Sequence, residues 1–79
     1  MTPLVDSKYN PEQVVKYNRK HNLGYPEEGQ DCVIAYNFGL AFLAKYSNDC
    51  WIYRNRMEQE RVMSYNNMIG WMPLEAYCD

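Results

Sequence analysis

The stretch YPEEGQDCVIAY, Tyr25 to Tyr36, decides the fold because it changes from turn chemistry to strand chemistry within a few residues. In its first half, Pro26 fixes one backbone dihedral angle and Gly29 frees another, which is typical of a turn. Its second half is rich in residues that favour β-strands. Apolar residues follow a helical period before this stretch and a period of two after it. The sequence therefore predicts a helix before Tyr25 and strands after it.

The segment before the turn predicts a helix that follows an N-terminal arm, residues 1–9. Asn10 is a good N-cap, Pro11 suits the first helical position, and Glu12 favours the positive end of the helix dipole. The helix should run to about His21, with basic residues in its last turn, and residues 22–24 can form a left-handed stop. Its buried stripe is expected to be narrow and partly polar, with Val14, Tyr17, Asn18 and His21.

The segment after the turn predicts a small sheet. Three strands with hairpin-length loops between them are expected at Asp31 to Tyr36, Leu40 to Tyr46 and Cys50 to Arg54. The polar residues Arg56 to Arg61 favour a long hairpin loop. Val62 to Tyr65 and Ile69 to Met72 are then expected to form one interrupted strand. The predicted fold class is α+β, with the N-terminal helix packed on a small, curved, mostly antiparallel sheet of four to five strands.

The two tryptophans are expected to lie in one core or to flank it. Large aromatic side chains bury the most area per residue, and Trp51 lies within a predicted strand while Trp71 lies in the last one. Gly70 directly precedes Trp71 and should let the last strand approach closely enough for that indole to pack.

Length and composition restrict the class of protein. The 79 residues predict a single domain, with an arm plus helix at 1–24 and a β-rich part at 25–79. So small a chain buries only about 60 to 65% of its unfolded surface, and its eight Tyr and two Trp predict an exposed aromatic patch, so a homo-oligomer is expected. A net charge of −2 without a basic run disfavours nucleic-acid binding. No apolar run reaches membrane-spanning length and no secretory signal is recognised, which predicts a cytoplasmic protein.

The chemistry-bearing residues do not predict an enzyme. Glu27 and Glu28 are adjacent carboxylates in a turn, where side chains diverge and nothing desolvates them. His21 has no neighbouring nucleophile and is more simply a cation at a helix C-terminus. Isolated glycines exclude a phosphate loop. We therefore expect no catalytic residues and no cofactor.

The cysteines do not predict a metal site either. Their spacing contains no CxxC pair, and a single histidine cannot complete a zinc site. A reducing compartment is expected. Cys32 and Cys50 should be small apolar residues within strands, and Cys78 an exposed thiol.

Four motifs in order carry a resemblance: PEEGQ at Pro26 to Gln30, the strand VIAY, the strand CWIY, and GWMPLEAY at Gly70 to Tyr77. Together they resemble the phage and prophage family called domain of unknown function 551. The resemblance covers about residues 25 to 77, whereas residues 1–24 lie outside it and Glu75 stands where the family usually has a second proline. It implies a small protein encoded by a phage or prophage.

Two groups of residues are candidates for binding. Arginines beside tyrosines suit a nucleotide or phosphate through stacking and bidentate hydrogen bonds, and such residues bracket one loop: Tyr53, Arg54, Arg56, Arg61 and Tyr65. The simpler interpretation is a solvated loop whose arginines pair with Glu58 and Glu60. A second aromatic group near the helix suits a protein interface: Tyr9, Tyr17 and Tyr25.

These observations predict a non-enzymatic counter-defence protein of a phage that acts by binding. In one version, it is a homo-oligomeric sponge that sequesters a nucleotide immune signal. In another, it is an inhibitor that docks on a host defence protein, such as a CRISPR effector. A phage accessory protein without a defence role is the third alternative. The phage setting follows from the resemblance and from no residue of the chain by itself.

Overall fold

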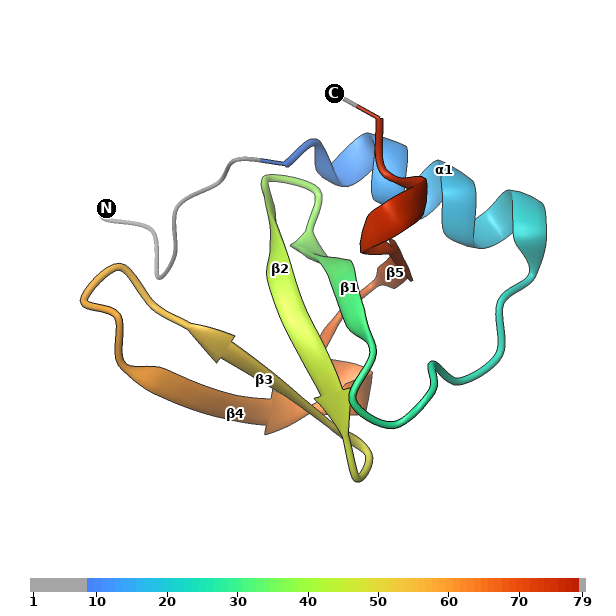
Figure 1. Cartoon of the computed structure of the whole chain (residues 1–79). Helices are drawn as coiled ribbons and strands as arrows, with labels where there is room; N and C mark the ends of the chain where they lie inside the picture. Colours follow the sequence, from blue (N-terminus) through green and yellow to red (C-terminus); the bar gives the residue numbers. More distant parts are fainter. Residues whose placement is uncertain (1–8, 79) are drawn as a thin grey trace.

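One helix packs on a five-stranded antiparallel sheet in the computed structural model, which describes residues 9–78 (Figure 1). The strands lie in the order β4-β3-β2-β1-β5, which confirms the predicted α+β class. None of the helices within the described residues has the length and apolar character to cross a membrane. The elements are α1 (Pro11–His21), β1 (Asp31–Asn37), β2 (Leu40–Ser47), β3 (Cys50–Arg54), β4 (Glu60–Ser64) and β5 (Gly70–Pro73).

The residues at the two ends of α1 cap the helix as predicted. The Asn10 side chain accepts a hydrogen bond of 2.9 Å from the backbone N–H of Glu12, and Asn22 ends the helix in a left-handed conformation with φ of 47°. The predicted buried stripe is wrong in part. Val14 is buried and Tyr17 and Asn18 are half-buried, as predicted, but Val15 is buried as well and His21, the last residue of the helix, is exposed.

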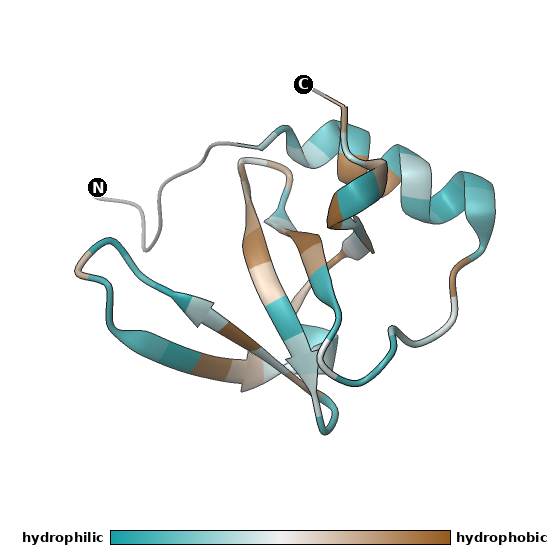
Figure 2. Ribbon diagram, viewed as in Figure 1, coloured by the Kyte–Doolittle hydropathy of each residue, from teal (hydrophilic) through white to brown (hydrophobic). Residues whose placement is uncertain are grey.

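The sheet separates two hydrophobic cores, because successive side chains of a strand point to opposite faces. Both faces of β1 are covered, so four consecutive residues, 32–35, are buried. Figure 2 shows the hydrophobic colour concentrated on the strands and the hydrophilic colour on much of α1. The helix-side core contains Val14, Val15, Val33, Ala35, Ala41 and Met72. The aromatic core, on the other face, contains Cys32, Ile34, Phe42, Ala44, Tyr46, Trp51 and Trp71.

Trp51 and Trp71 belong to this aromatic core, as predicted. Their ring centroids lie 6.4 Å apart, and both indoles are buried. Trp51 comes from β3 and Trp71 from β5, so the two rings connect strands that are not neighbours in the sheet.

In the C-terminal third of the chain, the observed strands differ from the predicted ones. Residues 62–65 and 69–72 do not form one interrupted strand: β4 pairs with β3, while β5 pairs with β1 at the opposite edge of the sheet. A 3-10 turn, Tyr65–Asn67, connects them. Period-two alternation identifies a strand but not its neighbour in the sheet, so the pattern could not show that the two segments pair with different strands. The loop between β3 and β4 is also shorter than the predicted loop, Arg56 to Arg61, because Glu60 and Arg61 belong to β4.

Gly70 lies where α1 approaches β5. A Cβ atom at this position would stand 3.1 Å from Oδ1 and 3.4 Å from Cβ of Asn18. The absence of a side chain at Gly70 therefore lets α1 approach β5 closely. The sequence had predicted a role for Gly70 only in the packing of Trp71.

The Gly70→Val variant is expected to lose about 1 to 3 kcal/mol of the free energy of unfolding, because the added methyl groups push α1 away from the sheet. Adding Asn18→Ala should restore part of the loss. Urea denaturation of the two variants measures both effects. Gly24→Val is the control, since a Cβ there meets nothing within 4 Å. Equal losses at positions 24 and 70 would contradict the close approach.

Candidate functional site

The PEEGQ motif fastens the chain before β1 to the turn between β2 and β3. The backbone N–H of Gly29 donates to the carbonyl of Tyr46 at 2.8 Å, and the N–H of Tyr46 donates to the carbonyl of Gln30 at 3.0 Å. The Glu28 carboxylate accepts from the Ser47 hydroxyl at 2.7 Å and from the backbone N–H of Asn48 at 2.9 Å. The glutamate side chain therefore has a structural role in the turn.

Glu28 gives this turn a pH dependence. The backbone N–H of Asn48 and then the Ser47 hydroxyl lower the pKa of the Glu28 carboxyl below its ordinary value of 4.5. Because the folded pKa is the lower one, the contribution to stability is complete above pH 4.5 and is lost as the pH falls through the lowered value.

The Glu28→Gln variant is expected to melt at a lower temperature than the wild type at pH 7, and the difference should shrink as the pH falls below 4. The reason is that the wild-type carboxylate becomes protonated and loses its charge-assisted bonds. Thermal melts from about pH 2.5 to pH 7 measure this. Glu27→Gln is the control, because the Glu27 carboxylate makes neither bond. A melting difference that is constant with pH would contradict the assignment.

A groove opens where β2 and β3 part. These strands pair at only three positions: Lys45 with Ile52, Tyr46 with Trp51, and Ser47 with Cys50. β3 continues to pair with β4 as far as Arg54 with Glu60, so the β3–β4 hairpin bends away from β2 as one unit (Figure 1). The resulting groove has a volume of about 640 Å³.

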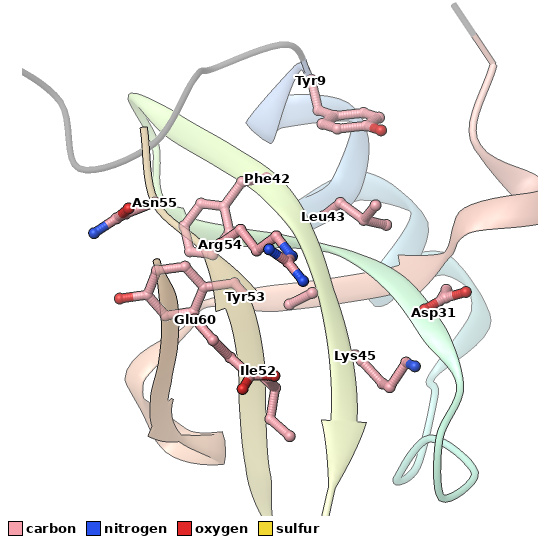
Figure 3. Close-up of a pocket in the computed structure, with 11 residues that line it drawn as sticks. Tyr9, Asp31, Phe42, Leu43, Lys45, Ile52, Tyr53, Arg54, Asn55 and Glu60 are labelled. Carbon is pink, nitrogen blue, oxygen red and sulfur yellow. The ribbon is translucent and has the colours of Figure 1, made fainter. Parts of the chain in front are cut away.

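The groove has an apolar floor and a charged rim (Figure 3). The rings of Phe42 and Tyr53 lie 4.9 Å apart between centroids and connect its two sides. Around them lie Leu43 and Ile52, and Tyr9 adds a third ring at one end. The remaining lining residues are Asp31, Ala44, Lys45, Arg54, Asn55 and Glu60.

The rim charges are ordered across the sheet. Lys45 and Arg54 belong to β2 and β3, the two strands that border the groove. Their cross-strand partners are acidic: Asp31 of β1 opposes Lys45, and Glu60 of β4 opposes Arg54. Each acid therefore lies one strand farther out than its base, and the positive charges lie nearest to the groove.

The predicted ligand residues do not form one cluster. Tyr53 and Arg54 both line the groove. Arg61 lies opposite Tyr53 in the register, so it shares the face of Tyr53 and points away from the face of Arg54. Tyr65 packs against the aromatic core, with its ring stacked on Trp51 at 5.6 Å. Arg56 lies in the turn between β3 and β4.

The arginine contacts in the hairpin are local. The guanidinium of Arg54 donates to the carbonyl of Glu58 at 3.3 Å, and that of Arg61 donates to Oε1 of Gln59 at 3.1 Å. For Arg54 and Arg61, these bonds go to a backbone carbonyl oxygen and to an amide oxygen.

The three tyrosines predicted as an interface are distributed over two regions. Tyr9 and Tyr17 pack against the helix-side core, Tyr9 with its ring 5.0 Å from that of Tyr77. Tyr25 lies over Tyr65 at 4.7 Å on the other side and is 69% exposed. Of the three, only Tyr9 lines the groove.

Sequence reasoning missed Phe42, Leu43 and Lys45 as groove residues. The available signal was the alternation of β2, which places Leu43 beside Lys45 on one face. Leu43 remains 42% exposed, and Lys45 on the same face of β2 is exposed as well. An exposed leucine next to a lysine is a weak signal by itself.

The cysteines lie as predicted, with Cys32 buried, Cys50 half-buried and Cys78 exposed. Burial, with a further contribution from Asp31, raises the pKa of the Cys32 thiol to about 12, so this thiol is not a nucleophile at neutral pH. Within residues 9–78, no group of three His, Cys, Asp or Glu side chains is arranged to hold a metal ion. No protein-family model, curated protein or solved structure matches the chain.

Proposed function

We propose that the protein is a non-enzymatic binding protein that acts by occupying a site on a partner protein. The observation that carries this proposal is the groove between β2 and β3, which combines an apolar floor with a cation on each bordering strand. Protein interfaces typically place aromatic and arginine side chains at such positions. Leu43 and Val62 add exposed apolar surface on the other face of the sheet from Phe42 and Tyr53, and they are 42% and 62% exposed.

A nucleotide ligand is the second candidate. The groove volume of about 640 Å³ falls in the range of small-molecule sites, and Arg54, Phe42 and Tyr53 all line it. Against it, Arg54 and Arg61 point to opposite faces of the hairpin, so one phosphate cannot use both. The geometry therefore supports a protein partner better than the three-arginine clamp of a nucleotide sponge.

The biological setting we propose is counter-defence in a phage-infected cell, with a host defence complex as the partner. The support for this setting is the resemblance of Pro26 to Gln30 and Gly70 to Tyr77 to a phage and prophage family. A homo-oligomer remains part of the proposal, because exposed Phe38 and Met57 add apolar surface outside the groove. Light scattering that gives a monomer at micromolar concentration would remove that part.

Two measurements test the proposed function. Immobilised protein is incubated with a panel of purified defence complexes, and the same protein is titrated calorimetrically with cyclic and ADP-ribose nucleotides. We expect capture of at least one complex, loss of capture in the double variant Lys45→Glu/Arg54→Glu, and no heat from the nucleotides. Lys16→Glu/Lys20→Glu, on the exposed side of α1, is the matched control.

The opposite result would overturn the choice of partner. A stoichiometric nucleotide titration without capture of any complex would establish the sponge instead. Equal plaque yields on hosts with and without defence systems, when the chain is expressed, would favour the accessory protein.

A further inference from the structure

The backbone of β2 directs hydrogen-bonding groups into the groove. Asn48 and Asp49 form a two-residue hairpin turn with φ of 48° and 61°, so Ser47 and Cys50 are the first pair that exchanges backbone bonds. Tyr46 directs its N–H and C=O the other way, since both bond to residues before β1. Along an antiparallel strand, the N–H and C=O groups of successive residues point alternately to one neighbouring strand and to the other. Leu43 therefore directs its N–H and C=O toward β3.

The backbone of β3 presents a matching pair of groups from the other side. The N–H of Asn55 donates to the carbonyl of Gln59 at 3.1 Å, so the backbone of Asn55 faces β4. Arg54, the residue before it, faces the opposite way, toward β2. Leu43 and Arg54 would be the next exchanging pair of the β2–β3 ladder, but the register ends at Lys45 with Ile52. Among residues 9–78, both strands thus present edges without a paired strand to one groove.

We propose that this groove receives an extended segment of the partner as an additional strand between β2 and β3. The inference rests on the protein-binding function proposed above and specifies how the partner is held. Open strand edges bind extended segments through main-chain hydrogen bonds, while side chains of alternate residues supply specificity. The backbone groups of Leu43 and Arg54 supply the first of these requirements from both sides of the groove.

The side chains of the groove specify the segment. On one face of the inserted strand, side chains meet Phe42 and Tyr53, so this face of the segment is apolar. On the other face, they lie beside Leu43 and Ile52 and beside Lys45 and Arg54, the two cations among the described residues that line the groove. The partner segment therefore alternates apolar and acidic residues.

A selection from a random heptapeptide library, displayed against the full chain, tests the insertion. We expect the selected peptides to alternate apolar and acidic residues. On binding, they should shift the NMR signals of the Leu43 and Arg54 amides. Methylating one central backbone nitrogen of a selected peptide should lower its affinity roughly 2- to 10-fold, because one main-chain hydrogen bond is lost.

Charge reversal provides the matched comparison. In the folded Lys45→Glu/Arg54→Glu variant, affinity for the acidic peptides should fall by roughly 10- to 100-fold, and a repeated selection should recover basic peptides. The Lys16→Glu/Lys20→Glu variant should bind like the wild type.

Two outcomes would overturn the inserted strand. One is a selection that enriches no peptide. The other is binding that leaves the Leu43 and Arg54 amides unshifted or is insensitive to backbone methylation. If a purified defence complex is still captured through Lys45 and Arg54, the protein-binding function stands and only the mode of docking is wrong. If capture fails too, both are wrong.

Discussion

The Trp51→Ala variant is expected to lose about 3 to 5 kcal/mol of the free energy of unfolding, the usual range for removing a fully buried tryptophan. The indole has no exposed surface. Its ring stacks on Tyr65 with 17° between the planes, and its Nε1–H donates to the Tyr65 carbonyl at 3.3 Å. Since small domains have only about 5 to 15 kcal/mol in total, this loss removes a large share of the stability of the protein. Urea denaturation followed by far-UV circular dichroism measures the loss.

Two control variants provide a scale for this loss. Trp51→Phe keeps an aromatic ring in the core and should cost less than the alanine change. Ile69→Ala removes a side chain that is 44% exposed and should change stability by less than about 0.5 kcal/mol. A Trp51→Ala variant within about 1 kcal/mol of the wild type would contradict the assignment of Trp51 as the anchor of β3.

The anchoring of β3 matters for the groove. Trp51 lies one residue before Ile52, the last position of β3 that pairs with β2. Beyond this point the β3–β4 hairpin is held to the sheet by aromatic contacts, in which Tyr53 packs on Phe42. The opening of the groove therefore depends on side chains of the aromatic core as well as on backbone pairing.

Local chemistry explains what the sequence predicted correctly. The bounds of α1 follow from Asn10, Pro11 and Asn22, each of which acts on its own neighbours. The turn between β2 and β3 is likewise local, because Asn and Asp tolerate the positive φ angles it requires. Such features are readable without knowing which strands pair.

Non-local pairing explains what the sequence did not predict. β5 is separated from β4 by a few residues yet crosses to the far edge of the sheet, where it pairs with β1. The candidate site shows the same limit. Whether Arg54 and Arg61 share a face depends on the register of β3 with β4, which places Tyr53 opposite Arg61. The parting of β2 from β3 depends on the curvature of the sheet, so Lys45 and Phe42 could not be assigned to the groove in advance.

The Val14→Asp variant is expected to lose more than about 3 kcal/mol at pH 7, because it places a carboxylate without a partner in the helix-side core. Val14 has no exposed surface and packs in the same cluster as Val33 and Met72. Urea denaturation between pH 4 and pH 8, followed by the far-UV circular dichroism of α1, measures the loss.

The pH dependence of this loss identifies its cause. Burial would raise the pKa of the new carboxyl in the folded state above its unfolded value, so the destabilisation should grow as the pH rises from 4 toward 8. Val14→Ala removes methyl groups without adding a charge, and its smaller loss should not depend on pH. If the two variants show the same pH profile, the aspartate has reached solvent and α1 is not held against β1 and β5 through this position. A pH-dependent loss in the aspartate variant alone would place Val14 between the helix and the sheet, the layer that also positions Tyr9 at the end of the groove.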